Sequence, residues 1–224
     1  MELRFLGHAA FALSDGGTTV LVDPFLTGNP RAAASADELD ATTILVSHGH
    51  GDHVGDTVAI AKRTGATVVA VVELANEIGG EGVDVRDPNL GGTETFDWGT
   101  VKLVPAWHTS TSPNGTPSIA CGLLIEFAGT TIYHVGDTCL FSDLQLVGRN
   151  RELDVALVPI GGHYTMDRHD AVEAVRLIGA KTVIPIHYDT FPPIETDAQA
   201  FKADVEAHTS SQVVVLAPGE SWTP

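Results

Sequence analysis

The sequence predicts an α/β domain in which two packed β-sheets are flanked by outer helices. Short apolar runs rich in β-branched residues recur along the chain and are bounded by Gly, Asp and Pro, as strands commonly are. Segments with apolar residues at helical spacing separate some of these runs. No linker or low-complexity stretch divides the 224 residues, so we expect a single domain spanning 1–224 with a sizeable core.

The expected strands begin near the N-terminus. Paired apolar runs flank Asp15-Gly16-Gly17, which indicates a hairpin, and a second hairpin is expected at Ala128-Gly129. The β-branched runs predict strands at 19–22, 43–46, 67–71, 101–104, 122–127, 130–133, 155–158, 182–186 and 212–216.

Four helices are expected between these strands. Apolar residues at helical spacing mark 54–64, which ends before Gly65, and more weakly mark 143–153. The segment 168–178 has the same spacing and is followed by Gly179, a typical C-cap residue. The fourth expected helix is 197–208.

The composition excludes several classes of partner. The formal net charge is −17 with only 12 basic residues and no basic run, and such a surface repels phosphate backbones, so nucleic acid is not expected. No apolar run approaches the roughly 20 residues of a membrane helix, and the N-terminus lacks a signal-peptide pattern. Cys121 and Cys139 make no disulfide framework, so we expect two reduced, mostly buried thiols in a cytoplasmic protein.

Polar residues of one kind gather in the stretch SHGHGDHVGD, residues 47–56. His48, His50, Asp52 and His53 lie within six residues, directly after an expected buried strand. The intervening glycines permit tight bends, so the imidazoles can converge. Neutral imidazole and carboxylate are usual ligands of zinc and related divalent ions. A helix cap with solvated loop histidines is the alternative, and it suits one histidine better than three.

Further ligand types follow other expected strands. His108 comes after 101–104, Asp137 after 130–133, and His187 after 182–186. Sheet proteins commonly build ligand sites at the carboxyl ends of strands. We therefore expect these three residues to complete a metal site with the 48–53 cluster.

The order of these residues resembles the metallo-β-lactamase superfamily, whose pattern is HxHxDH, a later His, a bridging Asp and a final His. The stretches Phe5–Phe11, 47–56 and Pro159–Met166 are more narrowly similar to a poorly characterised metal-dependent hydrolase family close to the ascorbate-6-phosphate lactonase branch. The resemblance implies a four-layer αββα sandwich of the α/β (α+β) class. It also implies that Asp23 supports the ligand loop through hydrogen bonds, although an ordinary turn Asp before Pro24 explains the same residue.

The resemblance further implies two divalent metal ions, zinc by preference, with manganese, nickel or iron as alternatives. One ion would be held by His48, His50 and His108. The other would be held by Asp52, His53 and His187, and Asp137 would bridge both.

The implied chemistry is hydrolysis of a small ester, lactone, amide or phosphodiester by a hydroxide bound to both ions. Asp52 could take the proton from the bound water, and His163 could stabilise an oxyanion or protonate the leaving group. His8 either faces the substrate or is a satisfied turn histidine. Trp107 and Tyr164 either line the pocket or, as aromatic residues at strand ends more often do, pack against the fold.

The remaining histidines suit structural or surface positions. His134 lies within an expected strand and suits the core, and His169 and His208 suit the surface at helix ends.

Other functions on the same scaffold stay open. A metal-dependent nuclease is the main alternative, and the acidic charge argues against it. Di-iron redox relatives carry Glu where this chain has His50, and glutathione thioester hydrolases carry an added helical region after the last strand. A further alternative is that the metals are purely structural. Structural metals usually bind closed sites that contain cysteine, and the expected ligand set has none. The expected partner is a small-molecule substrate, and the sequence leaves homo-oligomer formation open.

Overall fold

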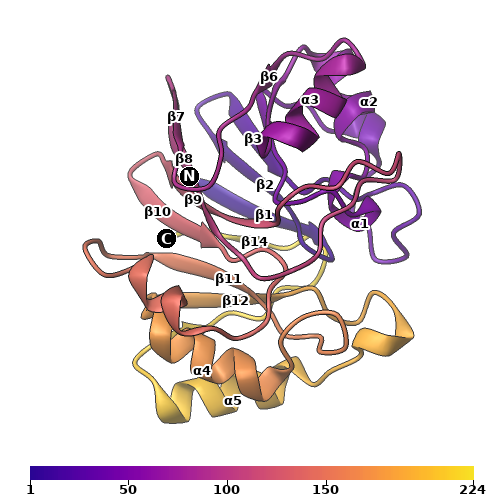
Figure 1. The fold of residues 1–224 in the computed structure, drawn as a ribbon. Helices are drawn as coiled ribbons and strands as arrows, with labels where there is room; N and C mark the ends of the chain where they lie inside the picture. The colour runs from indigo at the N-terminus through magenta and orange to yellow at the C-terminus, as the bar shows by residue number, and fades with distance from the viewer.

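Two β-sheets lie face to face, and helices cover the outer face of each one (Figure 1). The computed structural model describes all residues from 1 to 224. Helices α2 (Thr57–Thr64) and α3 (Val72–Gly80) lie on one side of the sandwich, and α4 (Arg168–Ile178) and α5 (Ala198–His208) lie on the other. The expected four-layer αββα arrangement is therefore confirmed.

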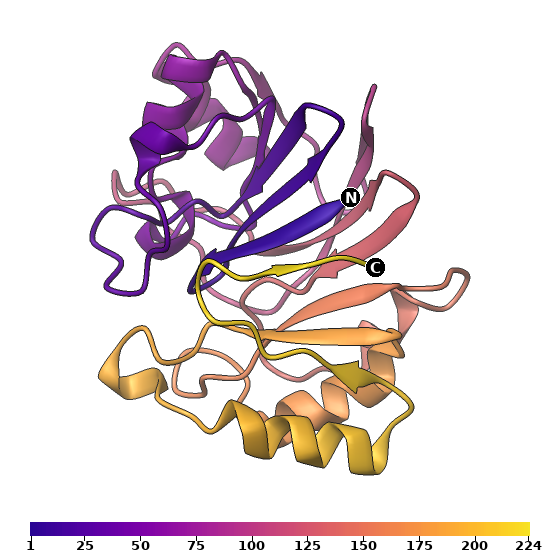
Figure 2. The same ribbon diagram turned by 180° about the vertical axis from the view of Figure 1, so that it is seen from behind.

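The first sheet has seven strands in the order β14-β1-β2-β3-β4-β5-β6. Their bounds are β1 Glu2–Gly7, β2 Ala10–Asp15, β3 Thr18–Val22, β4 Thr43–Leu45, β5 Thr67–Val69, β6 Val85–Arg86 and β14 Ser221–Trp222. The C-terminal strand β14 pairs antiparallel with β1, so the two ends of the chain lie close together (Figure 2).

The second sheet also has seven strands, in the order β13-β12-β11-β10-β9-β8-β7. Their bounds are β7 Thr93–Phe96, β8 Gly99–Pro105, β9 Cys121–Phe127, β10 Thr130–His134, β11 Val155–Pro159, β12 Thr182–Ile186 and β13 Gln212–Val213. The hairpins expected at 15–17 and 128–129 are confirmed as the β2–β3 and β9–β10 turns.

Strand direction brings the expected polar residues to one edge of each sheet. In the first sheet, β1 and β3 are both antiparallel to β2 and so run in the same direction, and β4 runs parallel to β3. In the second sheet, β8 and β10 are both antiparallel to β9, and β11 and β12 run parallel to β10. The carboxyl ends of β1, β3 and β4 therefore share an edge, as do those of β8, β10 and β12.

Two helix predictions need correction. The helix expected at 54–64 is broken into α1 (Gly51–Val54) and α2, because Gly55 adopts φ 42° where a Cβ atom would lie 2.4 Å from the Pro24 carbonyl oxygen. The helix expected at 143–153 is wrong, since only a 3₁₀ turn, Ser142–Leu146, forms there. Gly148 then passes so close to α4 that a Cβ would lie 2.7 Å from the Ile178 carbonyl oxygen.

Several elements were not expected from the sequence. Helix α3 follows β5 at once, so the apolar run 67–71 ends as a strand at Val69 and its last residues lead into the helix. Strands β6, β7 and β14 are two to four residues long and carry no clear apolar alternation. The strand expected at 212–216 is shortened to β13.

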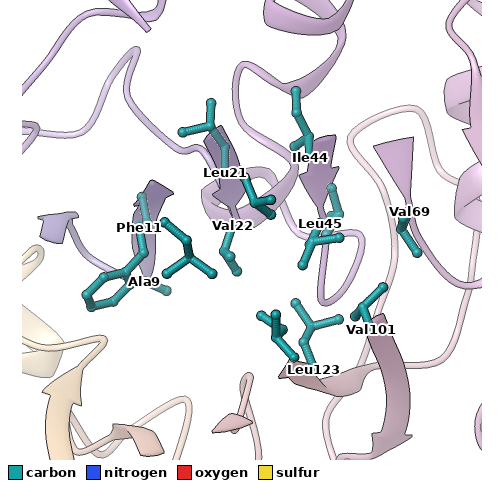
Figure 3. Close-up of a cluster of buried hydrophobic side chains, with 14 of the residues drawn as sticks. Ala9, Phe11, Leu21, Val22, Ile44, Leu45, Val69, Val101 and Leu123 are labelled. Carbon is teal, nitrogen blue, oxygen red and sulfur yellow. The ribbon is translucent and has the colours of Figure 1, made fainter. Parts of the chain in front are cut away.

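The main core lies between the two sheets. It contains 39 buried residues from both sheets and from α2 and α3, and Figure 3 shows Leu45 of the first sheet facing Val101 and Leu123 of the second. A separate group of 20 buried residues, including Val175 and Phe201, joins the second sheet to α4 and α5. Burying an aliphatic side chain contributes about 1.5–3 kcal/mol, so these two interfaces fix how the sheet edges meet.

The two cysteines differ in environment. Cys121 is buried and its thiol donates a hydrogen bond to the Ser47 carbonyl oxygen at 2.9 Å. Cys139 is exposed, so the expectation that both thiols are mostly buried is wrong for this residue. It follows the β10 strand end, where the chain leaves the sheet. Both cysteines are free, and none of the helices has the length and apolar character needed to span a bilayer.

Candidate metal centre

Seven side chains that follow strand ends converge where the two sheet edges meet. We call them the donor cluster: His48, His50, Asp52, His53, His108, Asp137 and His187. Their nitrogen and oxygen atoms fall into overlapping groups in which the atoms all lie within 4.8 Å of one another. The seven residues named from the sequence are therefore brought together, although four separate chain segments supply them.

The first set of donors is His48, His50 and His108. His48 Nε2 lies 3.0 Å from His50 Nδ1, and the ring of His108 is 5.2 Å from that of His48, centre to centre. His48 is wholly buried, whereas His50 and His108 are partly exposed. Burial lowers the pKa of all three imidazoles, so at neutral pH each ring keeps a free nitrogen lone pair.

The second set is Asp52, His53 and His187, and His8 joins it in the same group of atoms. His187 Nε2 lies 3.8 Å from Asp52 Oδ2, and the rings of His53 and His187 stack with centres 5.6 Å apart. The Asp52 side chain is the most exposed of the set, at 29%. Asp52 is therefore the member of this set that a small molecule can reach most easily.

Asp137 lies between the two sets. Its Oδ2 is 3.0 Å from His187 Nε2, 3.5 Å from His108 Nε2 and 4.0 Å from His48 Nε2. Its Oδ1 is 3.4 Å from His53 Nε2. Burial alone would raise the pKa of this carboxyl group, but the charges of His187 and His53 hold it well below its usual value. The carboxylate is thus ionised and faces donors of both sets.

Asp23 supports the second set through a hydrogen bond to His53. It is fully buried and accepts hydrogen bonds from His53 Nδ1 at 2.7 Å, the Ser47 backbone N–H at 2.7 Å and the Ser47 hydroxyl at 2.6 Å. A carboxylate that binds Nδ1–H turns the Nε2 lone pair of the same ring outward. This geometry supports the ligand-supporting role of Asp23 over that of an ordinary turn residue.

The metal-free His53 ring lies between two carboxylates, Asp23 and Asp137. Burial lowers its pKa, but the charges of Asp137 and Asp23, together with the hydrogen bond to Asp23, outweigh burial and raise the pKa well above the usual value. At neutral pH the ring therefore carries a proton on each nitrogen. A cation placed at Nε2 would take the position of one of these protons.

The donor set fits divalent metal ions. Four of its buried atoms have no hydrogen-bond partner: His53 Nε2, Asp137 Oδ1, His187 Nδ1 and His187 Nε2. Leaving buried polar atoms unpaired costs about 1–3 kcal/mol each, so such a concentration at one point indicates a missing partner. Imidazole and carboxylate are suited to zinc and to neighbouring transition metals.

The structure does not bring His163 into this group. His163 is exposed, and its ring packs edge-on against Tyr164 with centres 4.5 Å apart. Tyr164 is itself 54% exposed and Trp107 is 68% exposed, so the expectation that these two aromatic residues pack in the fold is wrong. Tyr164 lines the cavity described below, and Trp107 does not.

The remaining histidines lie where the sequence placed them. His134 is buried, and its Nε2 lies 3.1 Å from the Ala9 carbonyl oxygen. His169 and His208 are exposed at the ends of α4 and α5. His8 is 1% exposed and both of its ring nitrogens are hydrogen-bonded, so it is a satisfied turn histidine and not an open substrate contact.

Other contacts that support the site carry no sequence motif. Thr190 binds His8 Nδ1, and Ser110 Oγ accepts a hydrogen bond from the Gly49 N–H at 2.9 Å. Glu77 of α3 accepts hydrogen bonds from Ser112 and Asn114, which ties the 110–116 loop to α3. Only His8 had a usable signal, because it follows a strand end as the other donors do.

A cavity of about 570 Å³ opens onto the donor cluster. Its lining residues are His50, Asp52, His108, Thr109, Asp137, Tyr164, His187, Phe191 and Pro193. Donors from both sets therefore line the cavity together with Tyr164, Phe191 and Pro193. A cavity of this size suits a small molecule.

An αββα sandwich with histidines and carboxylates gathered at one sheet edge defines the class of metallo-hydrolases. Residues 2–187 match the beta-lactamase superfamily domain. A UPF0173 metal-dependent hydrolase of Pelotomaculum thermopropionicum is 50% identical over 99% of both chains, and one of Thermus thermophilus is 48% identical over 98% of this chain and 97% of its own. The chain belongs to the beta-lactamase superfamily and, within it, to the UPF0173 metal-dependent hydrolases.

Solved structures agree with this assignment. The metallo hydrolase Igni18 of the archaeon Ignicoccus hospitalis is 34% identical, with a TM-score of 0.90 over 99% of this chain and 97% of that chain. An isothiocyanate hydrolase from Delia radicum gut bacteria is 18% identical with a TM-score of 0.76 and shares the fold. The resemblance seen in the sequence is thus confirmed, and the protein is a metal-dependent hydrolase.

Proposed function

We propose that the protein hydrolyses a small carboxylic ester or lactone that carries little negative charge, at a site that holds two divalent metal ions, preferably zinc. The observation that carries this proposal is the division of the donor cluster into two sets that share Asp137. His48, His50 and His108 would hold one ion, and Asp52, His53 and His187 would hold the other. Two such ions supply a water of lowered pKa and polarise the scissile carbonyl group.

The chain's own groups position and deprotonate the reactants. Burial tends to raise the pKa of Asp52, but its hydrogen bond to His8 and the charge of His53 lower it, so the carboxylate is ionised at neutral pH and can accept a proton from the attacking water. Phe191 and Pro193 line the same cavity as the donors, and their apolar side chains exclude water from part of it. The cavity thus orients a substrate with a flat or apolar part.

The charge of the cavity wall supports the substrate class. None of the 12 Lys and Arg residues lines the cavity, so no side-chain cation is present to bind a phosphate or a second carboxylate of a substrate. The basic residues that pair with acids elsewhere are Lys62, Arg63, Arg151, Arg168, Arg176, Lys181 and Lys202. With a net charge of −17, the protein also disfavours the polyanionic substrates of a nuclease.

We propose a small molecule as the partner and the cytoplasm as the compartment, and the free thiols of Cys121 and Cys139 support a reducing environment.

Protein purified without chelator tests the metal site. We expect two equivalents of a divalent metal by elemental analysis in the native chain, and loss of both metal and hydrolysis in His48→Ala, His108→Ala and Asp137→Ala. His169→Ala is the matched control, because this histidine is exposed on α4 and neither belongs to the groups of close donor atoms nor lines the cavity. Full metal content in the combined triple variant would rule out the ligand assignment.

A comparison of substrates tests the class of reaction. We expect kcat/KM for a neutral phenyl ester or a lactone to exceed that for bis(p-nitrophenyl) phosphate by at least about tenfold, since no cavity cation attracts the phosphate. Activity on the ester should depend little on salt, whereas RNA binding that weakens steeply with salt would indicate a nuclease. A preference for the phosphodiester would refute the substrate class while leaving the metal site intact.

A further inference from the structure

His8 occupies an unusual position directly behind the donor cluster. It lies in the tight turn between β1 and β2 with φ 59°, and its side chain is buried. Its Nε2 atom lies 3.2 Å from Asp52 Oδ2, and its Nδ1 atom lies 2.8 Å from Thr190 Oγ1. The ring also packs on His187, with ring centres 4.1 Å apart. One imidazole thus contacts a donor that follows the first sheet, Asp52, and two residues of the segment that follows β12.

The partners of this ring determine where its hydrogen lies. An ionised carboxylate has no hydrogen, so the Nε2 atom of His8 must donate to Asp52 Oδ2. The neutral ring then has a lone pair on Nδ1, and the Thr190 hydroxyl must donate to it. The Thr190 hydroxyl has a second acceptor, the Tyr188 carbonyl oxygen, but that contact is longer, at 3.4 Å.

We infer that His8 is a positioning residue for Asp52: its Nε2–H holds the Asp52 carboxylate in place beside His53 and His187, and Thr190 fixes the tautomer that makes this possible. The inference rests on the proposed metal site. A carboxylate oxygen has two lone pairs, so Asp52 can accept from His8 and still bind a cation. Partners of this kind typically change metal affinity or activity by about 10- to 100-fold when removed.

A direct ligand role for His8 is the competing possibility, because its nitrogen belongs to the same group of close atoms as Asp52, His53 and His187. That role would need a lone pair on Nε2. The lone pair would then face the ionised Asp52 oxygen at 3.2 Å, which is repulsive. Positioning agrees with all the contacts of the ring, whereas ligation contradicts the shortest contact on the Nε2 side.

Two substitutions at His8 separate these roles. Metal-free protein is titrated with Zn²⁺ or Mn²⁺ in a calorimeter, so the readout does not depend on hydrolysis. We expect His8→Ala to weaken binding of one of the two ions by about 10- to 100-fold. His8→Gln should keep the affinity within about threefold of the native chain, since its amide can donate to Asp52 but is a poor ligand for these metals. Equal losses in both variants, with binding reduced to one ion, would show ligation and overturn the inference, as would unchanged affinity in His8→Ala.

Thr190→Val provides a second test that leaves His8 in place. Loss of one hydrogen bond to the ring should weaken the same ion by about 2- to 10-fold. Thr57→Val is the matched control, because Thr57 is a buried threonine whose hydroxyl has no hydrogen-bond partner. Thr190→Val binding that matches the control would contradict the role of Thr190, even if His8→Ala does not fold. If no metal binds the native chain, the proposed site fails, which is distinct from failure of this inference.

Discussion

Asp23→Asn isolates the effect of one buried carboxylate on metal affinity without changing its volume. The native Asp23 accepts the Nδ1–H of His53 at 2.7 Å and so leaves Nε2 facing the donor cluster. The amide of Asn can instead donate to Nδ1, which favours the tautomer with a hydrogen on Nε2. A ring in that tautomer has no lone pair for a metal at Nε2, so we expect the second set to bind its ion more weakly.

The magnitude follows from the contacts that change. Loss of a supporting carboxylate typically costs about 10- to 100-fold in metal affinity, which is about 1.4–2.7 kcal/mol. The three hydrogen bonds to Asp23 are of the charge-assisted kind, worth about 1.5–3 kcal/mol each against about 1 kcal/mol for neutral bonds. We therefore expect the metal-free variant to lose about 3 kcal/mol of unfolding free energy. For a chain of this length that corresponds to about 6–12 °C in Tm.

Isothermal titration of metal-free protein measures the affinity, and thermal unfolding with chelator measures the stability. Asp154→Asn is the matched control, because Asp154 also accepts a backbone N–H, from Thr131 at 2.9 Å, but lies at the opposite end of β11 from the donors. The control should lose stability only. Native metal affinity in Asp23→Asn, with the fold intact, would refute the idea that Asp23 sets the tautomer of His53.

Three further predictions concern, in turn, how metal binding depends on pH, whether His163 takes part in turnover, and whether Phe191 contacts the substrate. Although burial lowers the pKa of His53, its flanking carboxylates raise it well above the usual value, so the metal-free ring is protonated on both nitrogens at pH 7. A ring that binds a metal through Nε2 lacks the Nε2 proton. Metal binding at pH 7 should therefore release about one proton, and metal affinity should rise about tenfold for each unit by which the pH rises. Calorimetry in buffers of different ionisation enthalpy measures the proton, and a buffer-independent enthalpy contradicts the prediction. Because His163 is exposed and does not line the cavity, His163→Ala should keep its metal and leave turnover little changed, and slowed turnover across several substrates would restore the catalytic role that the sequence suggested. Phe191→Ala should raise KM for an aromatic ester by about tenfold with kcat little changed, because the lost wall contact is made before and during reaction; an unchanged KM would show that Phe191 does not contact the substrate.

The positions of the donor residues could be predicted because each follows a strand that is legible in the sequence. His108, Asp137 and His187 come after apolar, β-branched runs, and the direction of those strands then places all three residues at one edge. Glycine spacing in 47–56 also signalled a loop that can bend. Strand patterns and glycine spacing involve residues that are close together in the chain, so they can be recognised in a single sequence.

The contacts that orient the donors could not be predicted, because they join distant parts of the chain. The bond from His53 to Asp23 spans 30 residues and that from His8 to Thr190 spans 182 residues. The break at Gly55 has the same origin, since it depends on the close approach of the segment at Pro24. Such contacts depend on how the two sheets pack, which no local pattern specifies.

The backbone at the ends of three strands explains how these distant contacts are aimed. His8, Asp23 and His187 each follow the last residue of a strand, and each adopts a left-handed conformation, with φ of 59°, 44° and 54°. His and Asp tolerate this region better than most residues, but each instance still costs about 1–3 kcal/mol. The turn redirects the side chain from the strand toward the shared edge, and hydrogen bonds made by these residues offset the cost. The His187 N–H donates to the His8 carbonyl oxygen at 2.8 Å, which links the two sheets directly at the donor cluster. Since a β-branched residue at any of these positions would be disfavoured in the same conformation, the backbone itself restricts which side chains can build the site.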